Sequence, residues 1–271
     1  MANDGLAGHP LVRLALENLR PLLKRAEVGL LKLAEKGQVR SEDDTTLPEH
    51  EFYDQDVFRK AGALVDAFDR LEQSQRLIET APEAALHGAG LDRHTWIEYH
   101  YSYYLITIVS LADVALVLAN GVFRLGNRER DCKQDLISRN WWVAQTPVKG
   151  ALEGLAKLTR PHKEGRNRHV HWGRLQPIAE VMESKLLDQL KLYSFLQRVG
   201  KPVVASSILD QAYRLEITKI SGTLDLERAQ IEGGIVALFD ALFPIYKSRS
   251  EELHQSWRRG METTGEPAER K

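Results

Sequence analysis

Apolar residues recur every three or four positions over most of this chain, which is the spacing of helices that pack one face against a core. No stretch alternates apolar and polar positions as a strand does. The chain is therefore predicted to be all-α, a bundle of about seven helices. Pro21, Pro147 and Pro177 fall inside the repeats and are expected to kink them. The best-marked helices are predicted over 10–36, 54–80, 92–125, 131–158 and 166–200.

Glycine, proline and polar residues predict how these helices are grouped. Ala81-Pro82 and the glycines of 87–90 separate an N-terminal helical region, 1–90, from a core with C-terminal helices, 91–258. The polar end of the chain, 259–271, is interpreted as a flexible tail.

The C-terminal part of the core is predicted to form two helices. A helix over 203–219 is expected to end before a turn at Ser221-Gly222. The last helix, over 224–257, is expected to be weakened by Gly233-Gly234 and Pro244, because interior glycine and proline cost about 1 and about 3 kcal/mol.

The segment 92–125 combines the most apolar part of the chain with an aromatic start. Asp92 is a candidate helix N-cap. The aromatic residues of 96–104 favour core packing over stacking on RNA bases. Ser110, Asp113 and Asn120 interrupt the apolar stretch from Tyr103 to Phe123, so it is interpreted as a buried helix and no membrane partner is expected.

Two polar residues within predicted helices have open roles. Asp113 lies in the apolar stretch and is expected to be buried, with Arg166 as one candidate partner. A helix cap or a simple surface position is the alternative for this aspartate. Asn140 either lines a cleft or bonds the neighbouring backbone.

Composition and charge exclude several classes of protein. Hydrophobic residues make up 43% and charged residues 28% of 271, as in soluble globular proteins. The net charge of −1 excludes a protein that coats nucleic acid through bulk charge, so any RNA contact requires a local basic patch. Cys132 is the only cysteine, which excludes an intramolecular disulfide and a thiolate zinc cluster and favours a cytoplasmic location.

One such basic patch lies in residues 160–174. It contains a single acidic residue, Glu164, and three of the nine histidines of the chain. Its cations are expected to contact the phosphates of RNA. They are Arg160, Lys163, Arg166, Arg168 and Arg174.

Within this patch, Arg166, Asn167 and His171 form a group that can do chemistry. An arginine binds phosphate through two nitrogens, and a histidine can move a proton to or from a hydroxyl near neutral pH. Together they can cleave RNA without a metal or another cofactor. On a helix Asn167 and His171 lie about 40° apart but Arg166 and His171 about 140° apart, so two copies of the helix would complete a site.

The spacing of this arginine and histidine is not specific. Arg93 with His100 and Arg249 with His254 also have four to six residues between them. Only Arg166 is followed by asparagine, comes after a loop marked by proline and glycine, and lies in a basic cluster.

Arg166-Asn167-x-x-x-His171 resembles the R-x(4–6)-H motif, with a polar residue after the arginine, of the HEPN superfamily of small all-α domains. The aromatic-rich segment 99–104, continuing to Asp113 and Asn120, is similar to the helix that precedes the motif in prokaryotic branches. The likeness covers residues 91 to about 200 and implies a HEPN-like core.

Many HEPN domains are metal-independent endoribonucleases with a composite site at a homodimer interface. The resemblance implies that Arg166 binds phosphate, His171 is the acid/base group and Asn167 orients them. It further implies a toxin or phage-defence factor that cleaves single-stranded RNA and is controlled by an antitoxin or regulatory protein. The alternative is a non-catalytic HEPN-like module that binds RNA, nucleotide or a protein partner.

Other chemistry has weaker support in the sequence. His169 and His171 could share a metal only on a strand, because they lie about 160° apart on a helix. The chain has no Walker or Rossmann glycine pattern, no G-x-S-x-G elbow and no H-E-x-x-H pair. No metal site and no cofactor are therefore expected.

Overall fold

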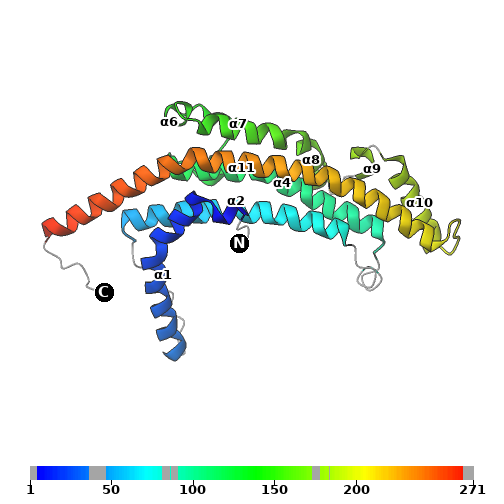
Figure 1. Ribbon diagram of the computed structural model, residues 1–271, viewed down its shortest axis with the longest axis horizontal. Helices are drawn as coiled ribbons and strands as arrows, with labels where there is room; N and C mark the ends of the chain where they lie inside the picture. Colours follow the sequence, from blue (N-terminus) through cyan, green and yellow to red (C-terminus); the bar gives the residue numbers. More distant parts are fainter. Residues whose placement is uncertain are drawn as a thin grey trace. The chain divides into compact units, whose positions relative to one another are not determined.

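The computed structural model describes residues 5–36, 47–80, 86, 91–172, 178–182 and 184–264, and every element in these ranges is a helix. The predicted all-α class is confirmed (Figure 1). In chain order the elements are η1 (Gly5–Gly8), α1 (Pro10–Lys36), α2 (Glu49–Glu79), α4 (Arg93–Phe123), η2 (Glu129–Asp131), α5 (Gln134–Ser138), α6 (Trp141–Ala144), α7 (Val148–Thr159), η3 (Arg160–His162), α8 (Lys163–Trp172), α9 (Ile178–Val181), α10 (Lys185–Arg198) and α11 (Ser206–Thr264).

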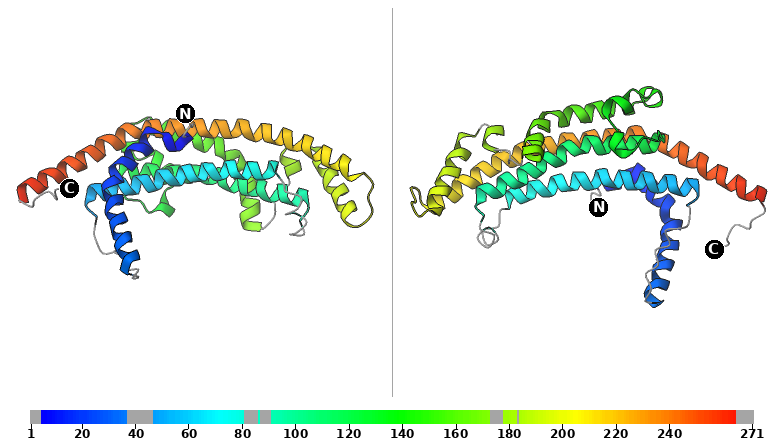
Figure 2. Two further views of the ribbon diagram at one scale, coloured as in Figure 1. Left: turned by 60° about the horizontal axis from the view of Figure 1, so that its bottom comes forward. Right: turned by 180° about the vertical axis from the view of Figure 1, so that it is seen from behind.

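The chain forms two compact units, and each is assembled from separate stretches of sequence. Unit 1 comprises 1–65, 113–153 and 235–271, and unit 2 comprises 66–112 and 154–234. Both units draw on residues from each side of position 90. Within each unit, segments of α2, α4 and α11 lie side by side (Figures 1 and 2).

The core of unit 1 is formed by α1, the first half of α2 and the C-terminal parts of α4 and α11. The Tyr53 hydroxyl joins α2 to α4 by donating to the carbonyl oxygen of Val122 at 2.9 Å. His9 Nε2 lies 3.1 Å from Asp240 Oδ1 and so connects the start of the chain to α11. The buried apolar side chains include Leu11, Ala15, Val57, Ala61, Leu64, Leu118, Val122, Leu238, Phe239 and Leu242.

The core of unit 2 contains the second half of α2, the start of α4, α10 and the first part of α11. The Trp96 indole donates to the carbonyl oxygen of Leu77 at 2.7 Å, which joins α4 to α2. Gln75 donates to Asp225 at 2.8 Å and joins α2 to α11. The buried apolar side chains include Phe68, Leu71, Ile78, Ile97, Tyr101, Tyr104, Ile108, Leu187, Leu190, Leu209, Tyr213, Leu224 and Ile231.

Apolar periodicity predicted the first three long helices well. α1 has the predicted bounds, and it continues through Pro21 while bending along its length (Figure 1). α2 begins five residues earlier than predicted, at Glu49. The residues that apolar periodicity places on its inner face are all buried: Val57, Ala61, Leu64, Val65, Phe68, Leu71 and Ile78. The backbone N–H of Thr95 donates to Asp92 Oδ1 at 2.8 Å, as expected for a cap at the start of α4.

The predicted helix over 131–158 is wrong, because this segment contains three helices. α5 ends at Ser138, and Asn140 is the N-cap of α6. The side-chain oxygen of Asn140 accepts from the N–H of Trp142 at 3.0 Å. Pro147 then precedes the first residue of α7, a position at which its missing N–H is tolerated. Of the two open roles of Asn140, the backbone bond is therefore the observed one.

The predicted helix over 166–200 is also wrong, because α8, α9 and α10 are separate. Ser184 caps α10 by accepting from the N–H of Leu187 at 3.2 Å, which sets a new helix start inside the predicted one. The end near Gly200 is confirmed, since this glycine has a φ of +73° that suits a helix C-terminus. Pro177 lies outside the described residues.

The predicted turn at Ser221-Gly222 does not form, and α11 is one continuous helix of 59 residues. It passes through both glycine sites and Pro244 and extends into the predicted tail as far as Thr264. At Gly234 an added Cβ would lie 3.4 Å from a methyl of Leu155 and of Leu158, so α7 packs directly against this part of α11. Packing of this kind offsets the low helix propensity of glycine.

Two helices in the described part of the chain are long and apolar enough to cross a membrane, α4 and α11. The most apolar window of α4 is 72% buried inside the structure, and that of α11 is 33% buried.

The tyrosines at the start of α4 have two environments. Tyr101 and Tyr104 are buried, whereas Tyr99 and Tyr103 are exposed. Only one face of the aromatic start of α4 is therefore packed in the core, and the other face is exposed.

Asp113 is not buried. This residue is exposed on α4, because it lies on the solvent side of the helix next to the buried pair Leu111 and Ala112. An exposed carboxylate needs no buried partner. Its surface role is the alternative that the sequence left open.

Candidate functional site

The basic cluster forms η3 and α8 of unit 2. Pro161 lies near the start of η3, where its missing N–H leaves no backbone bond unmade. α8 carries only Val170 and Trp172 as large apolar residues, and Val170 is exposed. The helix therefore lacks a continuous apolar face and needs polar anchors to hold it.

His162 is such an anchor, and sequence reasoning did not single it out. Its Nε2 lies 2.5 Å from Glu227 Oε1 on α11, and the other carboxylate oxygen accepts from the Tyr104 hydroxyl at 2.7 Å. Burial, followed by the charge of Glu227, raises the pKa of Tyr104, so this hydroxyl stays protonated as a donor. Glu227 lies 65 residues after His162, and no local pattern reveals the pair.

The motif residues divide between two sides of α8. Lys163, Asn167 and His171 are exposed, whereas Arg166 and His169 are half-buried. The exposed residues are spaced by four, so they form one stripe on the helix. Asn167 and His171 are neighbours on this stripe, as the sequence predicted.

The position of Arg166 is set by its neighbour. Arg166 Nη1 donates to Asn167 Oδ1 at 3.2 Å. Asn167 lies on the same stripe as His171, so the guanidinium has a hydrogen-bond partner on that stripe. The orienting role that the resemblance implies for Asn167 stays a prediction.

The two histidines of the motif have different environments. His169 Nδ1 is buried and has no hydrogen-bond partner among the described residues. The His171 side chain is exposed. They point to different sides of α8, as expected for positions two apart on a helix. His171 is the histidine that a phosphate or a ribose can reach.

The cations predicted to contact RNA differ in exposure and in pairing. Arg160 and Lys163 are exposed. Arg168 Nη2 forms an ion pair with Glu164 at 2.7 Å, which offsets part of its charge. Arg174 lies outside the described residues.

In the other two pairs with this spacing, Arg93 with His100 and Arg249 with His254, the histidines take part in structural contacts. Arg93 pairs with Asp210 at 3.2 Å, and the His100 ring packs on Trp96 with centroids 4.3 Å apart. His254 Nε2 lies 2.8 Å from the buried carboxylate of Asp54. Arg166 is thus the one of the three arginines whose side chain bonds an asparagine beside it.

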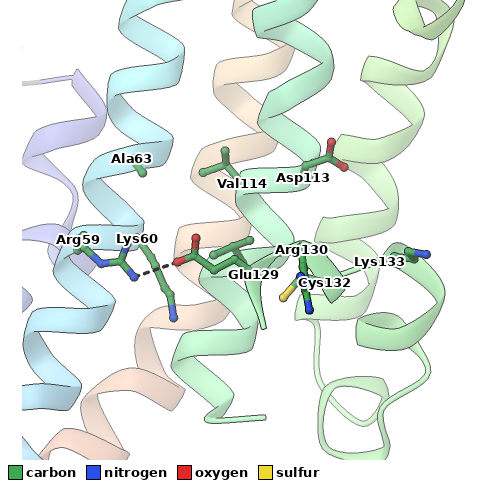
Figure 3. Close-up of a pocket in the computed structure, with 10 residues that line it drawn as sticks. Arg59, Lys60, Ala63, Asp113, Val114, Glu129, Arg130, Cys132 and Lys133 are labelled. Atoms are coloured by element: carbon green, nitrogen blue, oxygen red, sulfur yellow. Dashed lines mark hydrogen bonds and ion pairs between the residues drawn. The ribbon is translucent and has the colours of Figure 1, made fainter. Parts of the chain in front are cut away.

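Unit 1 contains a cavity of about 410 Å³ with an apolar wall of Ala63, Val114 and Val117 (Figure 3). The Arg59–Glu129 ion pair of 2.9 Å joins α2 to η2 at this cavity, and the exposed Asp113 also lines it. Its one thiol, Cys132, is buried, and burial raises the pKa of that thiol. A protonated thiol is a weak nucleophile, so Cys132 is not activated for covalent chemistry.

Comparison of the chain with protein-family models, with curated proteins and with solved structures found no match. Among the described residues, no group of three or more His, Cys, Asp or Glu side chains is arranged to hold a metal ion.

Proposed function

We propose that this protein is a metal-independent endoribonuclease of the HEPN type that cleaves single-stranded RNA. The observation that carries the proposal is the bond from Arg166 to Asn167, which gives the guanidinium a partner on the helix stripe that exposes His171. Cation, orienting amide and imidazole are the three groups that transfer of a phosphate to a neighbouring hydroxyl requires.

The reaction would proceed by attack of the ribose 2′-oxygen on the adjacent phosphorus. The O2′–P bond forms, the P–O5′ bond breaks, and the products are a 2′,3′-cyclic phosphate and a free 5′-hydroxyl. One imidazole accepts the 2′-hydroxyl proton and another donates a proton to the departing 5′-oxygen. Arg166 stabilises the negative charge that develops on the phosphorane.

A second copy of the chain completes the site in this proposal. One α8 supplies a single exposed imidazole of the motif, whereas the reaction uses a base and an acid. Two α8 helices related by a twofold axis would supply two His171 and two Arg166 side chains to one cleft. Such a cleft would also exclude water and strengthen the charge interactions within it.

The flanking cations would hold the RNA backbone. Arg160 and Lys163 are exposed beside the motif, and Arg168 is on the same helix. We assign Arg174 the same role from the sequence alone. Because the chain has a net charge of −1, binding through this local patch should weaken strongly with salt.

The biological setting proposed here is that of a cytoplasmic toxin or phage-defence factor. A nuclease that needs neither metal nor cofactor is active wherever it is folded and dimeric. Its activity therefore calls for a controlling partner, for which an antitoxin or another regulatory protein that covers α8 is the natural candidate.

A non-catalytic helical module is the second candidate function. It is favoured by the open position of His171, which does not line the cavities that contain Asp113, Phe195 and Trp257. In that case the same basic patch would bind RNA, a nucleotide or a protein partner without cleaving it.

The deciding experiment incubates labelled single-stranded RNA with the wild type, His171→Ala and Arg166→Ala in EDTA. The nuclease proposal expects cleavage that leaves 2′,3′-cyclic phosphate ends and is lost in both variants. Matched controls are His169→Gln, on the other side of α8, and Arg214→Ala, an exposed arginine of α11 in unit 2. Both controls should cleave as the wild type does.

The outcome also separates the two candidate functions. Cleavage that survives in His171→Ala would remove the role assigned to this histidine. Failure of every form to cleave, with RNA binding reduced by Lys163→Ala, would favour the binding module. Size-exclusion chromatography with light scattering tests the dimer independently.

A further inference from the structure

Unit 1 presents two adjacent tryptophans to solvent. Trp141 and Trp142 are the first two residues of α6 and are 64% and 59% exposed. Their rings meet edge to face, with centroids 4.7 Å apart and planes at 82°. Tryptophan is usually a largely buried residue, because its side chain offers a large apolar area. Two of them side by side on the surface indicate contact with a partner.

The two rings stand on an ordered backbone. Asn140 accepts from the N–H of Trp142 at 3.0 Å, and the buried Val143 anchors α6 in the core of unit 1. The Thr146 hydroxyl donates to the carbonyl oxygen of Val143 at 2.8 Å, just beyond the end of the helix. A surface that is already formed loses little conformational freedom when a partner binds.

The chain around the two rings has an excess of positive charge. Residues 128–149 contain five basic and three acidic residues, although the whole chain has a net charge of −1. The Arg139 side chain is 81% exposed and lies 3.9 Å from the exposed carboxylate of Asp135. An ion pair this open is largely screened by water, so the guanidinium remains available to an anion. The basic residues are Arg128, Arg130, Lys133, Arg139 and Lys149.

The cavity of about 410 Å³ brings further cations to this surface. It is lined by four basic and two acidic side chains. The Arg59–Glu129 ion pair neutralises one of each. Lys133 forms no ion pair with another described residue, and its side chain points away from Arg59 and Glu129 (Figure 3). Arg130 reaches Asp131 only at 4.0 Å. The mouth of the cavity is therefore positively charged.

One short helix joins this cavity to the tryptophan pair. α5 has five residues, so it is only about 7.5 Å long. Lys133, which lines the cavity, is its N-cap residue, and Arg139 is its C-cap residue. α5 also packs against α6. Cations and exposed aromatic rings thus follow one another over a short distance.

This combination suits single-stranded RNA better than a lipid or protein surface. Proteins that bind single strands combine a positively charged groove for the backbone with aromatic rings on which bases stack. A base that stacks on one ring leaves the charges around that ring in water. A membrane or a protein interface would instead cover Asp135 and Arg139 together with the rings, and removing such charges from water is costly.

We propose that α5, α6 and the adjoining cavity form a second contact surface for single-stranded RNA. Trp141 and Trp142 stack on bases, while Arg130, Lys133 and Arg139 contact phosphates. The identity of the ligand rests on the proposed function, to which this surface adds a contact in unit 1, apart from the basic patch of unit 2. Stacking uses the ring face that every base has, so binding here depends little on RNA sequence.

Fluorescence anisotropy of a labelled single-stranded 2′-O-methyl RNA tests this surface, because an RNA without 2′-hydroxyl groups binds but cannot be cleaved. Trp141→Ala and Trp142→Ala should each weaken binding about 5–150-fold, the usual effect of losing one stacked base. Arg139→Gln should lower the slope of log affinity against log salt by about 0.7, as for one phosphate contact on a single strand. The matched control is Phe52→Ala, at an exposed aromatic residue of α2 in unit 1, which should bind like the wild type.

A measurement on the wild type keeps the test valid if a variant fails to fold. The indole N–H signals of Trp141 and Trp142, identified in NMR spectra from their loss in Trp141→Phe and Trp142→Phe, should shift when the RNA is added. Unchanged signals, or equal affinity of the wild type and both alanine variants, would overturn the proposal. Weaker binding of both variants to phosphatidylserine vesicles, with RNA affinity unchanged, would also overturn it and assign the surface to lipid.

The outcome is separable from that of the nuclease assay. Binding of the 2′-O-methyl RNA that depends on both tryptophans, without cleavage of ordinary RNA, would remove the nuclease and support this surface. Cleavage by the wild type, with RNA binding that is indifferent to both tryptophans, would support the nuclease and overturn this surface.

Discussion

Arg166 with His171 and Arg249 with His254 have the same spacing on two helices, yet their surroundings are opposite. His171 is exposed on α8, and its arginine bonds the neighbouring Asn167. His254 is held by the buried Asp54, and Arg249 does not line the cavity that His254 lines. The spacing is therefore compatible with either a reactive or a fixed histidine.

The difference shows that partners decide what a histidine can do. An exposed imidazole with a nearby guanidinium can bind phosphate and exchange protons with a substrate. An imidazole that gives one nitrogen to a buried carboxylate has a fixed ring and contributes mainly to packing or to ligand orientation. Changes at the two histidines should accordingly separate activity from stability.

The largest expected effect is on activity. His171→Ala should lower the rate of RNA cleavage by about 10²–10⁴-fold, the usual contribution of a general acid or base. Its free energy of unfolding should change by no more than about 0.5 kcal/mol, because the side chain is exposed. His254→Ala should do the reverse: it should lose about 1.5–3 kcal/mol of stability and keep cleavage. Cleavage assays and urea denaturation of both variants measure the two effects. A loss of cleavage in His254→Ala would contradict the separation of activity from stability.

The next effect concerns the carboxylate that fixes His254. Asp54→Ala should lower the free energy of unfolding by about 3–5 kcal/mol, because it leaves several buried donors without an acceptor. Asp113→Ala, the same change at an exposed aspartate, should alter it by no more than about 0.5 kcal/mol. Urea denaturation compares the two, and equal values would contradict the role of Asp54.

The pH dependence of stability sharpens the comparison further. Burial, then His254, lowers the pKa of His50 below its usual 6.5 in the folded protein, while Glu51 and Asp54 oppose this shift. Below about pH 6.5 the unfolded chain therefore binds a proton more readily than the folded chain, and stability falls as pH falls. Wild type should lose more stability than His50→Phe between pH 7 and about pH 5 in urea denaturation. Equal losses would show that His50 does not contribute to the acid sensitivity.

The smallest effect tests the basic patch. Lys163→Ala removes an exposed cation beside the motif, so it should weaken RNA binding modestly and lower the slope of log affinity against log salt by about 1. Lys201→Ala, at an exposed lysine beyond α10, provides the matched control. Fluorescence anisotropy at several salt concentrations measures the slope, and an unchanged slope would remove Lys163 from the contact surface.

The sequence by itself determined the helical class and the inner faces of the long helices. Val57, Ala61, Leu64 and Leu71 of α2 are all buried as periodicity predicted, and Asp92 caps α4. These features depend on residues three or four apart and on local capping, so a pattern along the chain contains them. The same locality predicted that Asn167 and His171 share one side of α8.

Only the tertiary structure decided the length of α11, the contacts of Asp54 and the anchoring of α8. α11 crosses the site of the predicted turn at Ser221-Gly222, because packing outweighs local helix propensity. Asp54 meets Ser250 and His254 from about 200 positions away, and His162 meets Glu227 across 65. Contacts at such separations depend on how the helices pack, and no periodic pattern along the sequence records which polar side chains packing brings together.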